Sequence, residues 1–79
     1  MGAITRKQLR VLKYIYDFIQ KEQWAPTYDE LCSGLGLKSR ATIHQHLKVI
    51  EEKKLIEREK GSGRAIRLTE KGKKVLKEK

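Results

Sequence analysis

The sequence predicts a small α+β domain that is mainly α, with three helices, a small antiparallel β-hairpin and a short C-terminal helix. Apolar residues recur at helical spacing in separate segments of the chain. Two short segments suited to strands flank a loop that contains two glycines. The chain has 79 residues, which is enough for one small domain and too few for a second. The predicted order is helix, short strand, helix, helix, strand, strand, helix.

The first helix is predicted at residues 5–23. Thr5 and Gln8 have the spacing of a capping box, in which each side chain satisfies a backbone N–H of the other residue. An apolar stripe follows at helical spacing and predicts that this helix is central to the core. The stripe consists of Leu9, Leu12, Ile15, Tyr16 and Ile19, and is widened by Val11 and Phe18. Residues 24–26 are predicted to be extended, because the residue before Pro26 avoids the helical region. We expect a very short strand there, with Trp24 as an anchor in the core or at its edge.

Two further helices are predicted at residues 27–34 and 39–53. Thr27 and Glu30 form a second capping box, and Ser39 is the N-cap of the later helix. Between them, Gly36 supplies a backbone angle that other residues resist, and its two flanking leucines enter the core. One buried stripe is predicted on the later helix, formed by Ile43, Leu47 and Ile50. Two short helices joined by a tight turn indicate a helix-turn-helix, whose second helix enters a DNA groove.

The rest of the chain predicts a hairpin at residues 55–68 and a helix at residues 69–78. Leu55–Glu59 and Ala65–Leu68 are the expected strands, and the loop between them contains two glycines. Thr69 is a candidate cap for the last helix, which carries Val75 and Leu76 and five lysines between positions 71 and 79.

Positive charge is concentrated in the second half of the chain. The net charge is +9. Residues 1–37 carry five positive and four negative side chains, whereas residues 38–79 carry fourteen positive and six negative ones. A basic field on one part of a small domain suits a polyanion such as nucleic acid. The alternative is a lysine-rich surface that only keeps the protein soluble.

Several classes of function lack support in the sequence. The single cysteine, Cys32, excludes an internal disulfide and is predicted to be a small core residue. His44 and His46 cannot chelate one ion, because side chains two positions apart on a helix diverge by about 200°. The serines have no histidine and acid partners for catalysis, and the following glutamates are interpreted as surface charge: Glu51, Glu52, Glu57 and Glu59. We therefore expect no enzyme activity, no cofactor and no small-molecule substrate.

The sequence also lacks an apolar run near 18 residues and a signal peptide. We therefore expect no membrane association and a cytoplasmic, nucleoid-associated location.

The helix predicted at 39–53 presents a polar face opposite its buried stripe. At about 100° per residue, Ala41, Gln45 and Lys48 lie near the side opposite Ile43, and His44 lies at its flank. The positive end of the helix, capped by Ser39, suits a phosphate. A glutamine can pair twofold with adenine, and small residues such as Ala41 and Thr42 can approach a thymine methyl group. The alternative is an amphipathic helix with a solvated face.

The loop of the predicted hairpin is a second candidate contact. Lys60, Ser62 and Arg64 surround its tip, and an arginine on such a loop can enter the strongly negative minor groove. The alternative is a solvated turn. Lys53 is either a general phosphate contact or simply exposed.

These motifs together resemble the N-terminal DNA-binding domain of LexA-type repressors, a winged helix-turn-helix family. The resemblance covers about residues 3–68. It is carried by the opening Ala3–Gln8, by Pro26-Thr27 with Glu30, by Leu35–Leu37, Ser39 and His46–Lys48, and by Leu55-Ile56 with Arg64–Leu68. The resemblance implies that the wing around Gly61–Arg64 contacts the minor groove or the backbone, and that dimers bind short palindromes. It also implies major-groove contacts by Ser39, Arg40, Ala41, Thr42, His44 and Gln45, with Lys48 and Lys53 near phosphates.

The resemblance stops short of the second domain of that family, which carries a cleavage site, a serine nucleophile and a lysine base. Two explanations stay open: a natural stand-alone regulator, which the helical ending favours, and a domain excised from a longer protein. The expected function is sequence-specific binding of double-stranded DNA by a transcriptional regulator, a repressor that pairs as a homodimer on a palindromic operator. The alternatives are a winged-helix protein-interaction module and a protein that binds nucleic acid non-specifically through its lysine tail.

Overall fold

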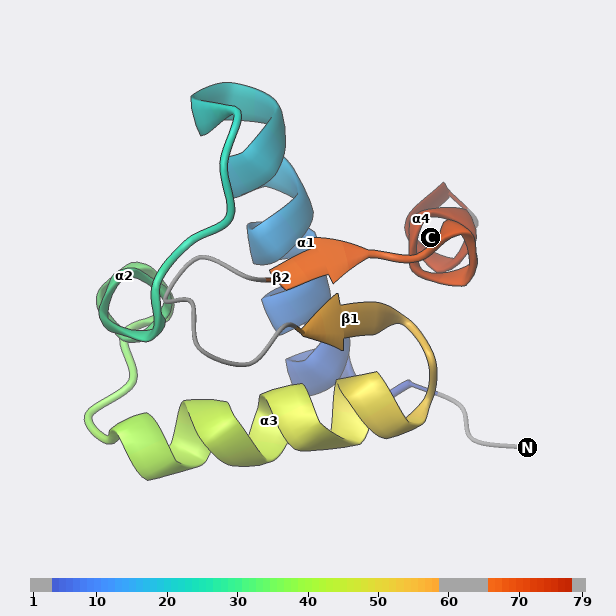
Figure 1. Ribbon diagram of the computed structural model, residues 1–79. Coiled ribbons are helices and arrows are strands. Elements are labelled where there is room, and N and C mark those ends of the chain that lie inside the picture. Colours follow the sequence, from blue (N-terminus) through green and yellow to red (C-terminus); the bar gives the residue numbers. More distant parts are fainter. Residues whose placement is uncertain (1–3, 59–65, 78–79) are drawn as a thin grey trace.

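The computed structural model describes residues 4–58 and 66–77. Its elements in chain order are α1 (Arg6–Glu22), α2 (Tyr28–Leu35), α3 (Arg40–Glu52), β1 (Ile56–Arg58), β2 (Ile66–Leu68) and α4 (Glu70–Lys77). In Figure 1, α1 passes behind the two strands, α3 runs along one edge of the fold, and α2 and α4 lie at opposite sides. Among the described residues, no helix has both the length and the apolar character needed to cross a bilayer.

Both predicted capping boxes are present. Gln8 N–H donates to the Thr5 hydroxyl at 3.1 Å, and Thr5 N–H donates to the Gln8 side chain at 3.2 Å. Thr27 and Glu30 make the same reciprocal pair at 3.1 and 2.8 Å. Each pair satisfies backbone donors that a helix start would otherwise leave without partners. Helices α1 and α2 therefore begin one residue after the threonines, and α2 ends one residue later than predicted, at Leu35.

The core lies where α1, α2, α3 and the hairpin meet. The predicted stripe of α3 is confirmed, because Ile43, Leu47 and Ile50 have no exposed surface. On α1 the fully buried part is narrower than the predicted stripe. Its buried residues are Val11, Leu12 and Ile15, whereas the other members of the predicted stripe are only half-buried: Leu9, Tyr16, Phe18 and Ile19.

The two strands pair antiparallel, with Ile56 opposite Leu68 and Arg58 opposite Ile66. β1 begins at Ile56, one residue later than predicted, and β2 ends at Leu68 as predicted, whereas Glu59, Ala65 and the hairpin loop lie outside the described ranges. The predicted strand at 24–26 is wrong for the described chain. Pro26 is buried but has no N–H to donate to a strand ladder. Trp24 was predicted to anchor the core or its edge, yet it is 52% exposed.

Helix α4 packs back onto α1 and β2 through Val75 and Leu76. Thr69 is its cap, as predicted: its hydroxyl accepts from Gly72 N–H at 3.0 Å and donates to the Lys54 carbonyl at 2.7 Å. Gly72 is buried, and a Cβ at this position would overlap the Leu55 carbonyl oxygen. The glycine therefore sets how closely α4 approaches the start of the hairpin.

Candidate nucleic-acid interface

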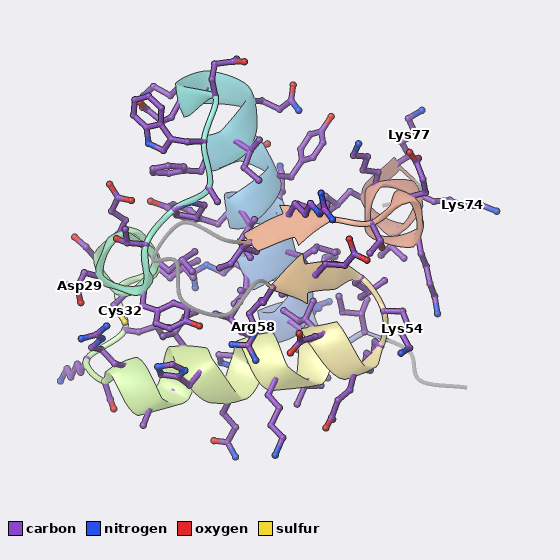
Figure 2. All side chains as sticks on the ribbon, viewed as in Figure 1. Asp29, Cys32, Lys54, Arg58, Lys74 and Lys77 are labelled. Atoms are coloured by element: carbon purple, nitrogen blue, oxygen red, sulfur yellow. The ribbon has the colours of Figure 1, made fainter. Side chains whose placement is uncertain are left out.

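Most of the outer face of α3 is not covered by other described elements, and α2 contacts it only at its flank and its start. Figure 1 shows the hairpin, α1 and α2 on one side of this helix, and in Figure 2 side chains of α3 project away from its other side. Seven of the predicted contact residues are exposed: Ser39, Arg40, Ala41, Thr42, His44, Gln45 and Lys48. Lys53, the C-cap of α3, is half-buried. The other three, Lys60, Ser62 and Arg64, lie outside the described residues.

The turn between α2 and α3 fixes the angle at which α3 is presented. Gly36 adopts a φ of 70°, in the left-handed region that favours glycine, as predicted. The next residue folds back, with Leu37 N–H donating to the Cys32 carbonyl at 2.9 Å. The Cys32 thiol lies 3.8 Å from the Ser39 carbonyl oxygen as a weak donor. Cys32, predicted to be a small core residue, is half-buried and packs against the core near the start of α3, so it lies at the margin of the core (Figure 2).

The start of α3 is open toward solvent. The Ser39 hydroxyl accepts from Ala41 N–H at 3.1 Å, which is the predicted N-cap bond. Arg40 at the first helical position extends sideways, and its Nε lies 3.4 Å from Asp29 Oδ1 of α2. The two side chains are 63% and 78% exposed, so water screens the pair and its strength is low. Arg40 can therefore exchange Asp29 for a phosphate or a base edge at little cost.

The ring of His44 packs edge-on against Tyr28 of α2, with ring centroids 4.3 Å apart and an interplanar angle of 72°. The Tyr28 hydroxyl accepts a hydrogen bond from Arg58 Nη1 at 3.1 Å. Tyr28 thus contacts the outer face of α3 with its ring and the hairpin with its hydroxyl. His46 faces inward and is half-buried.

Arg58 and Glu51 connect the hairpin to α3. Arg58 Nη2 and Nε lie 2.8 and 3.2 Å from the same Glu51 oxygen. Burial lowers the pKa of Arg58, but the hydrogen bonds to Glu51 and Tyr28 outweigh that effect and raise its pKa above the ordinary value. The stabilisation from this charge is therefore fully present below the ordinary arginine pKa and is lost only above the raised one.

This cluster corrects the interpretation of Glu51 as mere surface charge. Glu51 is half-buried, whereas Glu57 matches that interpretation, since it pairs with Arg67 across the strands at 3.1 Å and both are well exposed. One signal in the sequence could have revealed the cluster. Arg58 shares a strand face with buried Ile56, and a charge on an inward face needs a partner.

The described residues contain no group of three or more His, Cys, Asp or Glu placed to hold a metal ion. What the site offers is a helix with exposed hydrogen-bonding and small side chains, cations at its start and along its length, and a rigid attachment to the hairpin. Such a surface can bind an anionic double helix and contact its base edges.

Comparison with known proteins agrees with this geometry. The family model described as the LexA DNA binding domain matches residues 1–65. The LexA repressor of Lactobacillus johnsonii is 41% identical over 72 residues, which cover 91% of this chain and 35% of that repressor. The LexA repressor of Koribacter versatilis is 34% identical over 66 residues, covering 84% and 31%. The chain thus spans about a third of the length of these relatives.

Among solved structures, MepR, a transcription regulator of the Staphylococcus aureus multidrug efflux pump MepA, superposes with a TM-score of 0.77 at 28% identity. The match covers 95% of this chain and 53% of MepR. The structure of S. aureus MepR with DNA superposes equally well, with a TM-score of 0.77 at 29% identity over the same shares of the two chains. The fold is the winged helix of such regulators, and the chain belongs to the LexA DNA-binding domain family.

Proposed function

We propose that this chain binds double-stranded DNA sequence-specifically through the outer face of α3, and acts as a transcriptional repressor of the LexA type. The observation that carries the proposal is that face itself. Its side chains are exposed, small or able to hydrogen-bond, while the opposite stripe of the same helix is fully buried. The relatives named LexA repressor and the MepR complex with DNA support the same function.

In this mechanism, phosphate contacts position α3 and base contacts give specificity. Arg40, Lys48 and the N-terminus of α3 supply positive charge to the backbone. Gln45 is suited to an adenine edge, and Ala41 and Thr42 are small enough to approach thymine methyl groups. Binding at a promoter then excludes polymerase, and association with DNA would place the protein at the nucleoid.

The hairpin contributes in the proposed complex through its loop. Lys60, Ser62 and Arg64 are proposed to contact the minor groove or the backbone next to the groove that α3 occupies. The Arg58–Glu51 pair supports this, because it fixes β1 against α3.

Selection of bound duplexes from a random pool at physiological salt tests the proposed function. Enrichment of one palindrome is the expected result, and its half-site spacing reports how two copies pair. Enrichment of nothing, with binding that vanishes as salt rises, would leave a basic domain without base contacts.

Non-specific binding of nucleic acid is the second candidate, favoured by the exposed lysines of α4. Lys74 and Lys77 project from α4 away from α3 (Figure 2), so they can contact a polyanion independently of the outer face of α3. Two variants distinguish the contributions of these surfaces to DNA affinity: Lys74→Gln/Lys77→Gln changes α4, and Lys48→Gln changes the outer face of α3. If the proposed function holds, Lys48→Gln lowers the slope of log affinity against log salt by about one on the selected duplex. The α4 variant leaves that slope nearly unchanged.

Substitution of these lysines is preferable to deletion of α4. Val75 and Leu76 pack against the core, and Gly72 is buried against Leu55, so truncation would unfold part of the domain. A protein-interaction module, the third interpretation, predicts partner binding that salt does not weaken and no affinity for duplex DNA in the same assays.

A further inference from the structure

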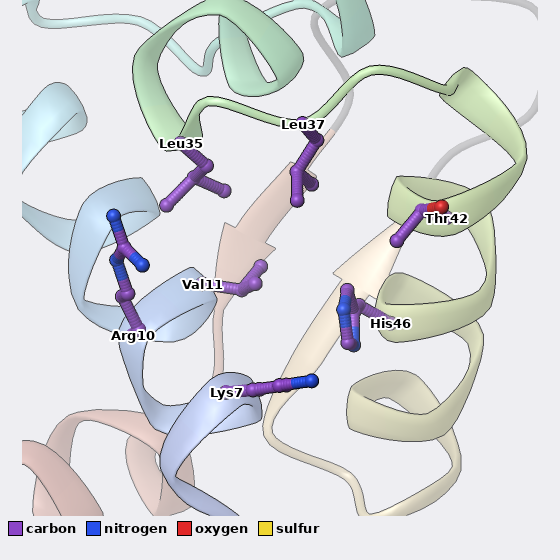
Figure 3. A pocket seen from close by; sticks show the side chains of 7 residues that line it. All are labelled: Lys7, Arg10, Val11, Leu35, Leu37, Thr42 and His46. Carbon is purple, nitrogen blue, oxygen red and sulfur yellow. The ribbon is translucent and has the colours of Figure 1, made fainter.

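A pocket opens between α1 and the inner flank of α3, apart from the outer face of that helix (Figure 3). Its apolar wall is formed by Val11 and Leu35, both buried, and by the half-buried Leu37. Its volume is about 170 Å³. A cavity of roughly 150 Å³ with apolar walls can hold a benzene molecule. The pocket therefore has room for one six-membered ring, and its open side leaves space for a substituent.

The rim of the pocket is positively charged. Lys7 and Arg10 are exposed and lie three positions apart on α1, so their side chains share one face of the helix. Lys7 extends across the opening toward His46, which with Thr42 lines the α3 side (Figure 3). None of the described residues that line the pocket is acidic. Within the ranges that the structure describes, neither Lys7 nor Arg10 forms an ion pair.

This combination selects among anions. A phosphodiester is polar all round, and pressing it against Val11 and Leu35 would remove water from its oxygens without replacing the lost hydrogen bonds. A carboxylate attached to an apolar ring satisfies both parts of the pocket. The ring covers the leucine and valine side chains, while the carboxylate lies at the cationic rim, on the side where the Lys7 ammonium group and an imidazole N–H of His46 can donate to it (Figure 3).

We propose that this pocket binds a small monocarboxylate that carries one apolar ring, and that its occupation opposes DNA binding. The second part rests on the proposed function. Thr42 belongs to both the pocket and the predicted DNA-contacting set, and a bound monocarboxylate adds one negative charge beside α3. If the ligand binds the DNA-free protein more tightly than the DNA complex, then DNA must bind the ligand-free protein more tightly than the ligand-bound protein, by the same factor.

The binding test is a titration of the isotope-labelled protein followed by amide NMR, with benzoate as the probe. Benzoate should shift resonances around Val11, Leu35, Leu37 and Thr42, with an affinity in the millimolar range. Benzyl alcohol keeps the ring without the charge, acetate keeps the charge without the ring, and both should bind more weakly. The variant Lys7→Ala/Arg10→Ala should weaken benzoate binding by roughly five- to tenfold. Lys13→Ala, an exposed lysine of α1 outside the pocket, is the matched control and should leave it unchanged.

Several results would overturn the binding site. These are equal shifts with benzyl alcohol or inorganic phosphate, shifts that lie elsewhere on the protein, and an affinity for benzoate that the Lys7→Ala/Arg10→Ala variant retains. The amide spectrum of each variant also shows directly that it is folded, and the substituted residues are exposed.

The effect on DNA is measured separately, as the affinity for the selected duplex with benzoate or with chloride at equal ionic strength. Benzoate should weaken DNA binding of the wild type, and the double variant should lose this sensitivity. Equal affinities in the two salts would refute the antagonism. Binding of benzoate without any DNA binding would refute only the proposed function, whereas DNA binding without benzoate binding would refute only the pocket.

Discussion

At the scale of single residues, the arginines of the two described hairpin strands each pair with a glutamate, in very different surroundings. Arg58 and Glu51 are 22% and 37% exposed and share a network with Tyr28, whereas Arg67 and Glu57 are 73% and 61% exposed. A hydrogen bond to a charged group contributes more where water is partly excluded, and an exposed pair contributes little. The same two residue types should therefore differ in their effect on stability.

Arg58→Met is expected to lower the free energy of unfolding by about 1–2 kcal/mol, because it leaves Glu51 and the Tyr28 hydroxyl without their donor. Arg67→Met makes the same chemical change in the exposed pair and should stay within about 0.5 kcal/mol of the wild type. Urea denaturation of both variants measures the difference. Equal losses would show that the partly buried cluster has no special role.

Asp29 lies where its charge can oppose DNA binding. It pairs with Arg40 at 3.4 Å and adds a negative charge beside the start of α3. Asp29→Asn should raise affinity for DNA roughly two- to threefold at low salt, and the gain should shrink as salt rises. Stability should fall by about 0.3–1 kcal/mol, because Asp29 lies in the first turn of α2 and favours its positive end.

The matched control is Asp17→Asn on α1, an exposed aspartate that is not part of the candidate interface. It removes the same charge from the whole molecule. If both variants raised affinity equally, net charge and not the release of Arg40 would be the cause.

Local chemistry decided which residues could be predicted from the sequence. Thr5 with Gln8 and Thr27 with Glu30 act within one helical turn, so their spacing predicted their bonds. The Arg58–Tyr28 contact joins residues 30 positions apart, and only the fold brings them together. The exposure of Trp24 likewise depends on where the end of α1 lies relative to the core, which residue type alone does not determine.

At the scale of elements, helices were predicted closely because caps, a glycine and apolar spacing mark their ends. Gly36 adopts a φ of 70° in the turn after α2, as predicted, and α2 ends at Leu35, one residue later than predicted. The sequence was less informative about which residues of a broad apolar stripe are fully buried, because the neighbouring elements decide this. On α1 they bury Val11, Leu12 and Ile15. The segment at 24–26 was mistaken for a strand because extended backbone before a proline is compatible with a strand without requiring one.

The docking of α4 on the hairpin depends on Gly72. Gly72→Ala should destabilise the domain by about 1–3 kcal/mol, because the new methyl group meets the Leu55 backbone carbonyl, which cannot rotate away as a side chain could. Lys73→Ala changes the next, exposed position and should stay within about 0.5 kcal/mol of wild type. Thermal and urea unfolding measure both. A Gly72→Ala protein as stable as Lys73→Ala would contradict the close contact.

At the scale of the whole molecule, size limits what one copy can contact. The principal dimensions are 29 × 25 × 22 Å, and the major grooves of successive half-sites on one face of DNA are about 34–36 Å apart. In the proposed complex, one copy therefore covers a single half-site. An operator long enough to be specific would then need two copies, in line with the homodimer expected from the sequence.

This limit predicts a dependence on half-site spacing. The affinity for a duplex with two half-sites at the selected spacing should exceed that for one half-site. Moving one half-site by about five base pairs should abolish the gain, because it turns the second groove to the opposite face. Electrophoretic mobility and fluorescence anisotropy measure this on three duplexes of equal length. Equal affinities on all three would show that the copies bind independently.

The central claim is that the outer face of α3 contacts base edges, and one specificity ratio tests it most directly. The ratio is the affinity for the selected duplex divided by the affinity for a scrambled duplex at the same salt. Gln45→Ala should lower this ratio roughly five- to a hundredfold, with little change on scrambled DNA. Gln20→Ala makes the same change at an exposed position on α1 and should leave the ratio intact. Equal losses on both duplexes with Gln45→Ala, or an unchanged ratio, would contradict the claim.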